Sequence, residues 1–224
     1  MVPKKTFFNL AARKRERFVK AAMDEFARHD YRGASVSRIV KKAGIAKGSV
    51  YQYFETKKDL YSYLVSRAAE TKFGFIDRAV PATANGFFER FKLTAFHGAR
   101  FDFDHPRLAG VLYNATYKPS GPEATAVSME LRRTALEYIR RLVEAGVQDG
   151  ELRGDTDVEF ATFALYQLTV SLRDYLAYRF GFSFEDAVRR GSANEIDKED
   201  LLSTLEALTE LFVRGIGTAP RQLG

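Results

Sequence analysis

The chain contains no cysteine among its 224 residues. This absence excludes disulfide bonds, thiolate nucleophiles and metal sites built from cysteine, so an oxidising compartment is not required. The chain also has no apolar run of about 18 residues, which excludes an ordinary membrane-spanning helix. Its first residues, MVPKKTFFNLAARKRERF, are basic and then amphipathic, without the apolar core and small-residue cleavage site of a signal peptide. We therefore expect a cytoplasmic protein.

Sequence signatures of catalysis are also missing. The chain has no G-x-S-x-G, H-E-x-x-H, P-loop or dinucleotide-binding pattern. A short acid–histidine cluster that could bind a metal consists of His97, Asp102, Asp104 and His105. Its spacing fits no standard metal site, and a helix end followed by a loop explains it better. We expect no metal and no cofactor, and a helical enzyme is the last of the alternatives considered.

The charged residues, by contrast, are plentiful and unevenly distributed. Residues 1–60 hold 15 lysines and arginines against 6 aspartates and glutamates, a net charge of +9. The other 164 residues hold 20 against 23, a net of −3, and the two parts give the +6 of the whole chain. Surface helices are often rich in lysine, but a basic quarter joined to a slightly acidic remainder indicates nucleic-acid binding at one end. The 46% of hydrophobic residues is enough for a packed core.

Residues 35–54, SVSRIVKKAGIAKGSVYQYF, have the layout of a helix-turn-helix. Periodicity predicts a preceding helix over about 12–29, and Ser35 is a suitable N-cap for the next helix. Gly44 should end that second helix because glycine tolerates a left-handed backbone, and the third helix should cover about 46–54. The apolar residues expected to face the core are Val36, Ile39, Val40, Ala43, Val50 and Phe54.

A long helix is expected directly after this motif, over about 57–78. Thr56 followed by Asp59 is a capping-box pattern, in which each side chain accepts a bond from the other's backbone amide. Lys57 would lie in the first turn, where the helix dipole disfavours cations and a bound phosphate would offset that penalty. The apolar residues on one side of this helix are Leu60, Leu64 and Ala68.

The stretch GASVSRIVKKAGIAKGSVYQYFETKKDLY resembles the N-terminal signature of TetR-type transcriptional regulators. The A-G turn, the K-G-[ST]-aliphatic-Y-x-Y-F string and the K-x-x-L start of the next helix coincide in order and spacing over about residues 12–65. The resemblance implies an all-α fold, with a three-helix helix-turn-helix DNA-binding domain over 1–56 and a larger helical effector-binding and dimerisation domain over 57–224. It also implies a regulator, by family habit a repressor, that binds a palindromic double-stranded DNA operator.

The resemblance further implies which residues contact DNA. Those expected to hold phosphates are Ser35, Lys47, Ser49, Tyr53 and Lys57. Gly48 would let the backbone approach DNA closely, and Arg38 could reach a base edge or the backbone. Tyr51 and Gln52 are the candidates for reading bases, because glutamine suits adenine and a tyrosine ring can touch a thymine methyl group. The alternative for Tyr51 and Tyr53 is that their rings pack in the domain core.

The last two predicted helices carry most of the apolar surface. Residues 157–180 contain the run FATFALYQLTVSL, which is apolar on more sides than a helix with one solvent-exposed face would be. We therefore expect this helix to bury two faces. The final helix, 198–216, has one apolar stripe formed by Leu201, Leu205, Leu208, Phe212 and Ile216. In the resembled family these two helices pair with those of a second copy, so the resemblance implies a homodimer. Packing within one chain would also explain the stripe.

An effector pocket is expected among the helices of the second domain. The chain has 19 phenylalanines and 11 tyrosines, mostly after residue 50, which would line an apolar or aromatic cavity. The candidate ligand contacts are polar residues within apolar runs: Asn114, Tyr117, Tyr166, Gln167 and Arg173. Each could instead be a satisfied core or surface residue. The expected effector is an unidentified lipophilic or aromatic small molecule, and the alternative is a second domain that only dimerises or binds protein.

Overall fold

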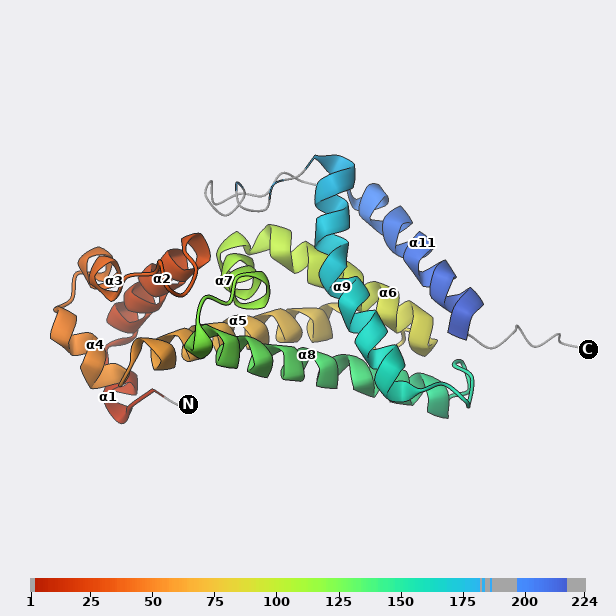
Figure 1. Cartoon of the computed structure of the whole chain (residues 1–224), viewed down its shortest axis with the longest axis horizontal. Helices are drawn as coiled ribbons and strands as arrows, with labels where there is room; N and C mark the ends of the chain where they lie inside the picture. Colours follow the sequence, from red (N-terminus) through yellow and green to blue (C-terminus); the bar gives the residue numbers. More distant parts are fainter. Residues whose placement is uncertain (1–2, 182, 184–185, 187–196, 217–224) are drawn as a thin grey trace, which may run out of the picture. The chain divides into compact units, whose positions relative to one another are not determined.

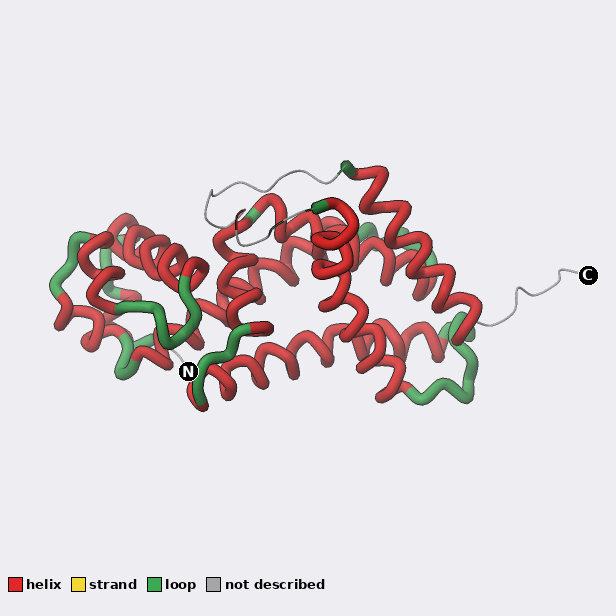
Figure 2. The backbone as a smooth tube through the Cα atoms, turned by 45° about the horizontal axis from the view of Figure 1, so that its top comes forward, coloured by secondary structure: helices red, strands yellow, loops and turns green. Residues whose placement is uncertain are grey.

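The computed structural model describes residues 3–181, 183, 186 and 197–216, and these residues form helices and loops without a strand (Figures 1 and 2). The expected all-α fold is confirmed. The helices are α1 (Lys5–Phe8), α2 (Ala12–Arg28), α3 (Val36–Ala43), α4 (Lys47–Tyr53), α5 (Lys57–Ala79), α6 (Gly86–Asp104), α7 (Pro106–Tyr117), α8 (Pro122–Gln148), α9 (Val158–Phe180) and α11 (Lys198–Ile216). None of the helices in these described ranges combines the length and apolar character needed to cross a membrane.

Contacts divide the described chain into two compact units. Unit 1 contains α1–α4, α5 as far as Lys72, α7, and α8 as far as Arg132. Unit 2 contains α5 from Phe73, α6 as far as Phe101, the rest of α8, α9 and α11. The division of function expected between residues 56 and 57 stays a prediction, because compactness alone does not show where one function ends and another begins.

The core of unit 1 is built from the apolar residues that the periodicity singled out. The side chains of Phe18 and Phe26 on α2 are fully buried. The expected inner faces are confirmed, since all of the following are buried: Val36, Ile39, Val40, Ala43, Val50, Phe54, Leu60, Leu64 and Ala68. This core fixes α3 and α4 against α2 and leaves their opposite sides at the surface.

Local signals set the ends of these helices as expected. The Ser35 hydroxyl accepts a bond from the Arg38 amide at 3.4 Å, and so caps α3. Gly44 ends α3 in the left-handed region, with φ of 64°. The capping box is also confirmed: the Thr56 amide donates to the Asp59 carboxylate at 3.0 Å, and the Asp59 amide donates to the Thr56 hydroxyl at 3.1 Å.

Unit 2 is held by two apolar clusters. One gathers residues of α6, α8 and α9, including Phe87, Val143 and Leu165. The other joins α6, α9 and α11. In the predicted stripe of α11, Leu201 and Leu205 are buried within this chain, whereas Leu208 and Phe212 are half-buried, and the side chain of Ile216 lies outside the described residues. Part of the stripe is therefore explained by packing within one chain.

Candidate nucleic-acid interface

Helix α4 has one buried side and one exposed side. Val50 packs inward, while Lys47, Gly48, Tyr51 and Gln52 are exposed and Ser49 is half-buried. A Cβ atom added to Gly48 would meet no other atom within 4 Å, so nothing in the described protein requires glycine at this position. An external surface that approaches the start of α4 closely would require it. The exposed side therefore offers hydrogen-bonding groups around an open backbone.

The two tyrosines of α4 differ in their surroundings. The Tyr51 side chain is 47% exposed, which excludes the alternative that it packs in the core. Tyr53 is 5% exposed, and its ring lies 6.2 Å from that of Phe18 and 6.1 Å from that of Phe7. The ring of Tyr53 therefore packs in the domain core, as the alternative for this residue predicts. A phosphate contact by its hydroxyl group stays a prediction.

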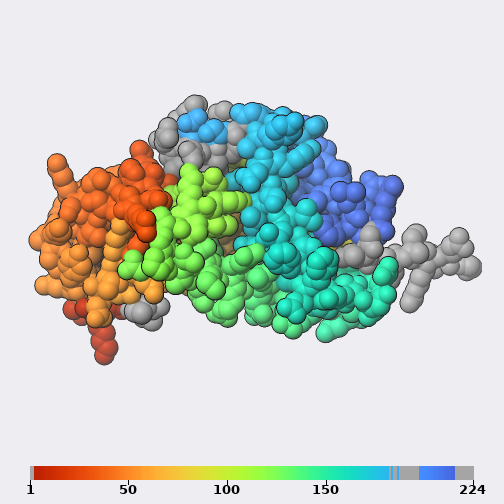
Figure 3. Space-filling view, viewed as in Figure 1, coloured from red at the N-terminus to blue at the C-terminus, as the bar shows by residue number. Residues whose placement is uncertain are grey.

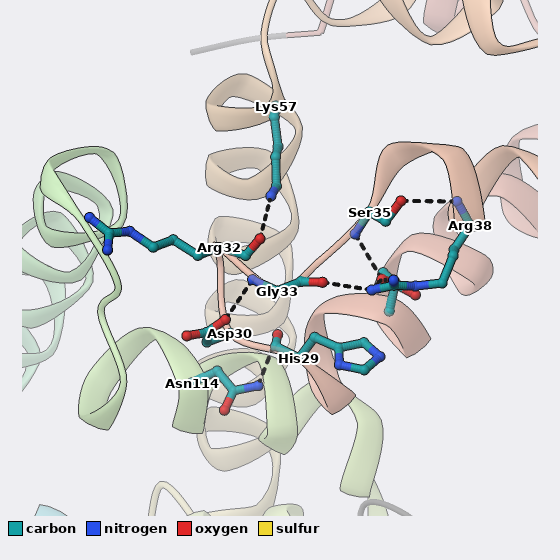
Figure 4. A network of polar contacts seen from close by, with 9 residues as sticks. His29, Asp30, Arg32, Gly33, Ser35, Arg38, Lys57 and Asn114 are labelled. Carbon is teal, nitrogen blue, oxygen red and sulfur yellow. Dashed lines mark hydrogen bonds and ion pairs between the residues drawn. The ribbon is translucent and has the colours of Figure 1, made fainter.

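Arg38 is held by the protein itself (Figure 4). Its Nε donates to the Glu25 carboxylate at 2.9 Å, and its Nη2 donates to the Gly33 carbonyl at 2.6 Å. The same Glu25 oxygen accepts a bond from the Ser35 amide at 2.8 Å. Glu25 thereby ties the start of α3 to α2, and Arg38 positions α3. A direct contact between Arg38 and DNA stays a prediction.

The pKa of the Glu25 carboxyl is lowered by this arrangement. Burial acts in the opposite direction and raises the pKa, but the hydrogen bonds from Arg38 and from the Ser35 amide, together with the charge of Arg38, outweigh it. Glu25 is therefore a permanent anion near neutral pH. Sequence patterns did not single it out, because its partners lie 10 and 13 residues further along the chain.

Lys57 also has partners within the protein. Its Nζ lies 4.7 Å from the centre of the Tyr31 ring and donates to the Arg32 carbonyl at 3.5 Å (Figure 4). Burial lowers the pKa of its ammonium, although Asp30 and Glu123 favour the charged form. Lys57 thus stabilises the loop before α3. Its contact with a DNA phosphate stays a prediction.

Asn114, one of the predicted effector contacts, is bound within the protein core. Its amide Nδ2 donates to the carbonyls of Phe26 at 2.9 Å, Ala27 at 3.1 Å and His29 at 3.3 Å (Figure 4 shows the last of these). These carbonyls end α2, where no further turn of helix supplies a donor. Asn114 is therefore a satisfied core residue that caps α2 from α7.

The other candidate effector residues belong to different units. Tyr117 belongs to unit 1, and its ring lies 4.8 Å from that of Tyr113. The three remaining candidates are on α9 in unit 2, where Tyr166 is buried, Gln167 is exposed and Arg173 is half-buried. Unit 1 has an open groove of 590 Å³, but none of the five predicted residues lines it. The location of an effector site is thus not given by these residues.

The acid–histidine cluster weighed as a metal site is not assembled in the described part of the chain. The Asp102 carboxylate pairs with the Lys72 ammonium at 2.8 Å. No group of three potential metal-binding side chains occurs among the described residues. The predicted helix end is found at Asp104, but a second helix follows in place of a loop, because α7 begins at Pro106 with His105 as its N-cap.

Comparison with known proteins bears on this surface directly. The sequence profile for bacterial regulatory proteins of the tetR family matches residues 18–64. The crystal structure of a TetR family transcriptional regulator from Chloroflexus aurantiacus is 33% identical, with a TM-score of 0.74 and a match covering 98% of this chain and 100% of that one. The chain belongs to the TetR family. All the predicted DNA-contact residues of this TetR regulator lie within the matched stretch.

Two further matches come from Bacillus subtilis and are named as regulators. The fatty acid metabolism regulator protein of Bacillus subtilis is 26% identical over 201 residues, which cover 88% of this chain and 93% of that protein. The structure of FadR from Bacillus subtilis in complex with stearoyl-CoA is 23% identical, with a TM-score of 0.64, and the match covers 90% of this chain and 98% of that one. This second likeness shows the fold alone. The chain is thus a TetR-family transcriptional regulator, and these relatives are named as regulators.

Proposed function

We propose that this TetR regulator is a homodimer that binds a palindromic DNA operator, represses transcription there, and leaves DNA when a lipophilic effector binds. The observation that carries the proposal is the exposed side of α4. A short helix packed through Val50 presents Lys47, Tyr51 and Gln52 outward. This arrangement suits insertion into the major groove of DNA. We also propose that 1–56 is the DNA-binding domain and 57–224 the regulatory domain.

The proposed contacts fall into two kinds. Lys47 and Ser49 near the start of α4, with Ser35 at the start of α3, are suited to phosphates, which fix the position of a protein on DNA without reading its sequence. Tyr51 and Gln52 are suited to base edges, where a glutamine amide can bond adenine and an aromatic ring can touch a thymine methyl group. Sequence preference should therefore depend on Tyr51 and Gln52 above all.

The exposed side of α9 supports the dimer. Phe160 is 69% exposed, Phe163 is 44% exposed and Tyr178 is 88% exposed. The surface of α9 runs across the visible face of the molecule in Figure 3. Large apolar surfaces of this kind are costly in water, and a two-fold axis would let the same helix of a second copy cover them. The proposed interface combines the exposed side of α9 with that of α11, where Leu211 is 71% exposed.

The relatives support a particular chemical class of effector. A Bacillus subtilis relative is named a fatty acid metabolism regulator protein, and the structure of FadR from the same organism was solved in complex with stearoyl-CoA. We propose a long-chain acyl-CoA as the first effector to test. The alternative function keeps the DNA-binding domain and gives the second domain only dimerisation or protein binding.

In vitro selection of bound DNA tests the operator. The wild-type protein should enrich a palindrome, and its affinity should fall steeply with salt because phosphate contacts release counterions. The double variant Tyr51→Ala, Gln52→Ala should keep salt-dependent binding but lose the preference for that palindrome. If the double variant selects the same palindrome as the wild type, α4 does not read the sequence.

A titration with acyl-CoA tests the effector. Stearoyl-CoA should release the selected palindrome and raise the melting temperature, since a ligand that binds only the folded state stabilises it. Free coenzyme A is the matched control, because it has the same nucleotide without the acyl chain. If neither acyl-CoA nor a broad set of lipophilic compounds changes the melting temperature, the alternative without a small ligand is favoured.

A further inference from the structure

The segment before α2 makes contacts to the end of α4. The backbone amide of Lys4 donates to the Tyr53 carbonyl at 2.9 Å, and its side-chain Nζ donates to the Tyr51 carbonyl at 3.2 Å. The Thr6 hydroxyl donates to the Gln52 carbonyl. Lys4 and Thr6 therefore supply donors to the last three carbonyls of α4, those of Tyr51, Gln52 and Tyr53 (Figure 1 shows α1 beside α4). This segment lies outside the family stretch 18–64.

These bonds matter because α4 is short. The helix has seven residues, Lys47–Tyr53, and Phe54 after it is already extended. The last carbonyls of any helix have no intrahelical donor, and a helix of about two turns has few internal hydrogen bonds to hold it. Here the missing donors come from another segment. The end of α4 that carries Tyr51 and Gln52 is thus fixed from outside the helix.

An aromatic anchor keeps the segment in place. The side chain of Phe7 is fully buried, and its ring lies 5.2 Å from that of Phe54 and 5.4 Å from that of Tyr63. The next residue, Phe8, is by contrast 51% exposed. Phe7 thus fastens α1 to the same core that supports α4, and the donors of Lys4 and Thr6 are held at the carbonyls without a long flexible connection.

We propose that residues 4–7, the N-terminal clamp, position the base-reading side chains of α4 and so help to set DNA sequence preference. The proposal rests on the DNA-reading role of α4 proposed above. Lys4 and Thr6 are positioning residues, since they act through the backbone of α4. The positive charge of Lys4 also lies where the dipole of α4 is negative, which favours the same arrangement.

Matched variants separate positioning from charge. Thr6→Val removes the hydroxyl and keeps the shape, whereas Thr6→Ser keeps the hydroxyl. Lys4→Met removes the ammonium that binds the Tyr51 carbonyl, and Lys5→Met removes the same charge from the next residue, which is exposed. Thr6→Val and Lys4→Met should each reduce discrimination between the selected palindrome and one with a changed base pair by about threefold to tenfold, the effect of one hydrogen bond. Thr6→Ser and Lys5→Met should leave that ratio unchanged.

Hydrogen exchange at the amides of α4, measured without DNA, provides the second readout. Thr6→Val should speed exchange in the last turn of α4 severalfold, and Thr6→Ser should restore the wild-type rate. The clamp is refuted if Thr6→Val leaves both the exchange and the base preference unchanged, or if Lys5→Met reduces discrimination as much as Lys4→Met. If the wild-type protein selects no DNA at all, the proposed function fails instead. The exchange rates alone then show whether the N-terminal clamp stabilises the end of α4.

Discussion

Helices α4 and α9 both expose aromatic side chains, but the residues around these side chains differ. On α4 the exposed ring of Tyr51 stands among Lys47, Gly48 and Gln52, so hydrogen-bonding groups and an open backbone surround it. On α9 the exposed rings of Phe160 and Phe163 belong to the predominantly apolar run FATFALYQLTVSL. The first surface suits a polar, charged partner, and the second suits another apolar surface.

The two helices also differ in how they are held. Helix α4 has seven residues, and donors from Lys4 and Thr6 bind its last carbonyls. Helix α9 has 23 residues, and Asp157 caps its start within the same segment. Helix α9 packs along its length into both apolar clusters of unit 2, whereas the short α4 depends on donors that another segment supplies to its end. The DNA-reading surface should therefore be sensitive to polar substitutions elsewhere in unit 1, and the α9 surface should not.

The largest effect is expected from charges on α9. In the double variant Phe160→Glu, Phe163→Glu, two carboxylates replace rings three residues apart on one side of the helix. Burial of each ring is worth about 1.5–3 kcal/mol, so the dimer should weaken by about 100-fold or more. Operator affinity should fall with it, because a lone α4 reads only one half-site. Sedimentation velocity and an operator titration measure the two effects.

Met129→Glu is the control for this variant. Met129 is 68% exposed on α8, so one such carboxylate enters an exposed apolar position outside α9. This control should remain dimeric and bind the operator as the wild type does. An α9 variant that stays dimeric would show that the exposed face of α9 is not the interface.

A second comparison lies within α4 itself. Gln52→Ala should cost about 1–3 kcal/mol at one base pair and relax the preference there. Lys47→Ala should weaken binding to all DNA sequences alike. It should also reduce, by about one, the steepness with which the logarithm of the binding constant falls with the logarithm of the salt concentration. Binding to a set of single-base operator variants at several salt concentrations separates the two. If Lys47→Ala changes base preference and Gln52→Ala changes only the salt slope, the two roles must be exchanged.

The structure shows why some of these features could be predicted from sequence and others could not. The Ser35 cap, the Gly44 turn and the Thr56–Asp59 capping box each depend on residues within about one helical turn, so local patterns give them. Helix α1 was missed because four residues show no periodicity. The bonds of Asn114 could not be predicted because its partner Phe26 is 88 residues away in sequence. Contacts of that range depend on the packing of α2 against α7, which no local pattern contains.

Asn114→Leu tests the sensitivity of unit 1 to a buried polar contact. The substitution leaves the carbonyls of Phe26, Ala27 and His29 without this donor. A buried acceptor without a partner costs about 1–3 kcal/mol, so urea should unfold the variant at a lower concentration. The dimer made through α9 should persist under native conditions, as sedimentation would show. If Asn114→Leu and the wild type are equally stable, the hydrogen bonds of Asn114 make no net contribution to the free energy of unfolding.

The smallest effect is expected from Glu25, and it depends on pH. Because its pKa in the folded protein is below the ordinary value of 4.5, the stability it contributes is present above that value and is lost as pH falls through the lowered pKa. Glu25→Gln should therefore be less stable than the wild type at neutral pH, and the difference in free energy of unfolding should shrink in acid.

Asp155→Asn in unit 2 is the control for Glu25→Gln. Arg153 lowers the pKa of Asp155 too, but that pair is exposed and screened by solvent, so its loss should change stability much less. Equal losses in the two variants would show that the bonds joining Glu25 to Arg38 and Ser35 are no stronger than a surface ion pair, and that α3 is held by apolar packing alone.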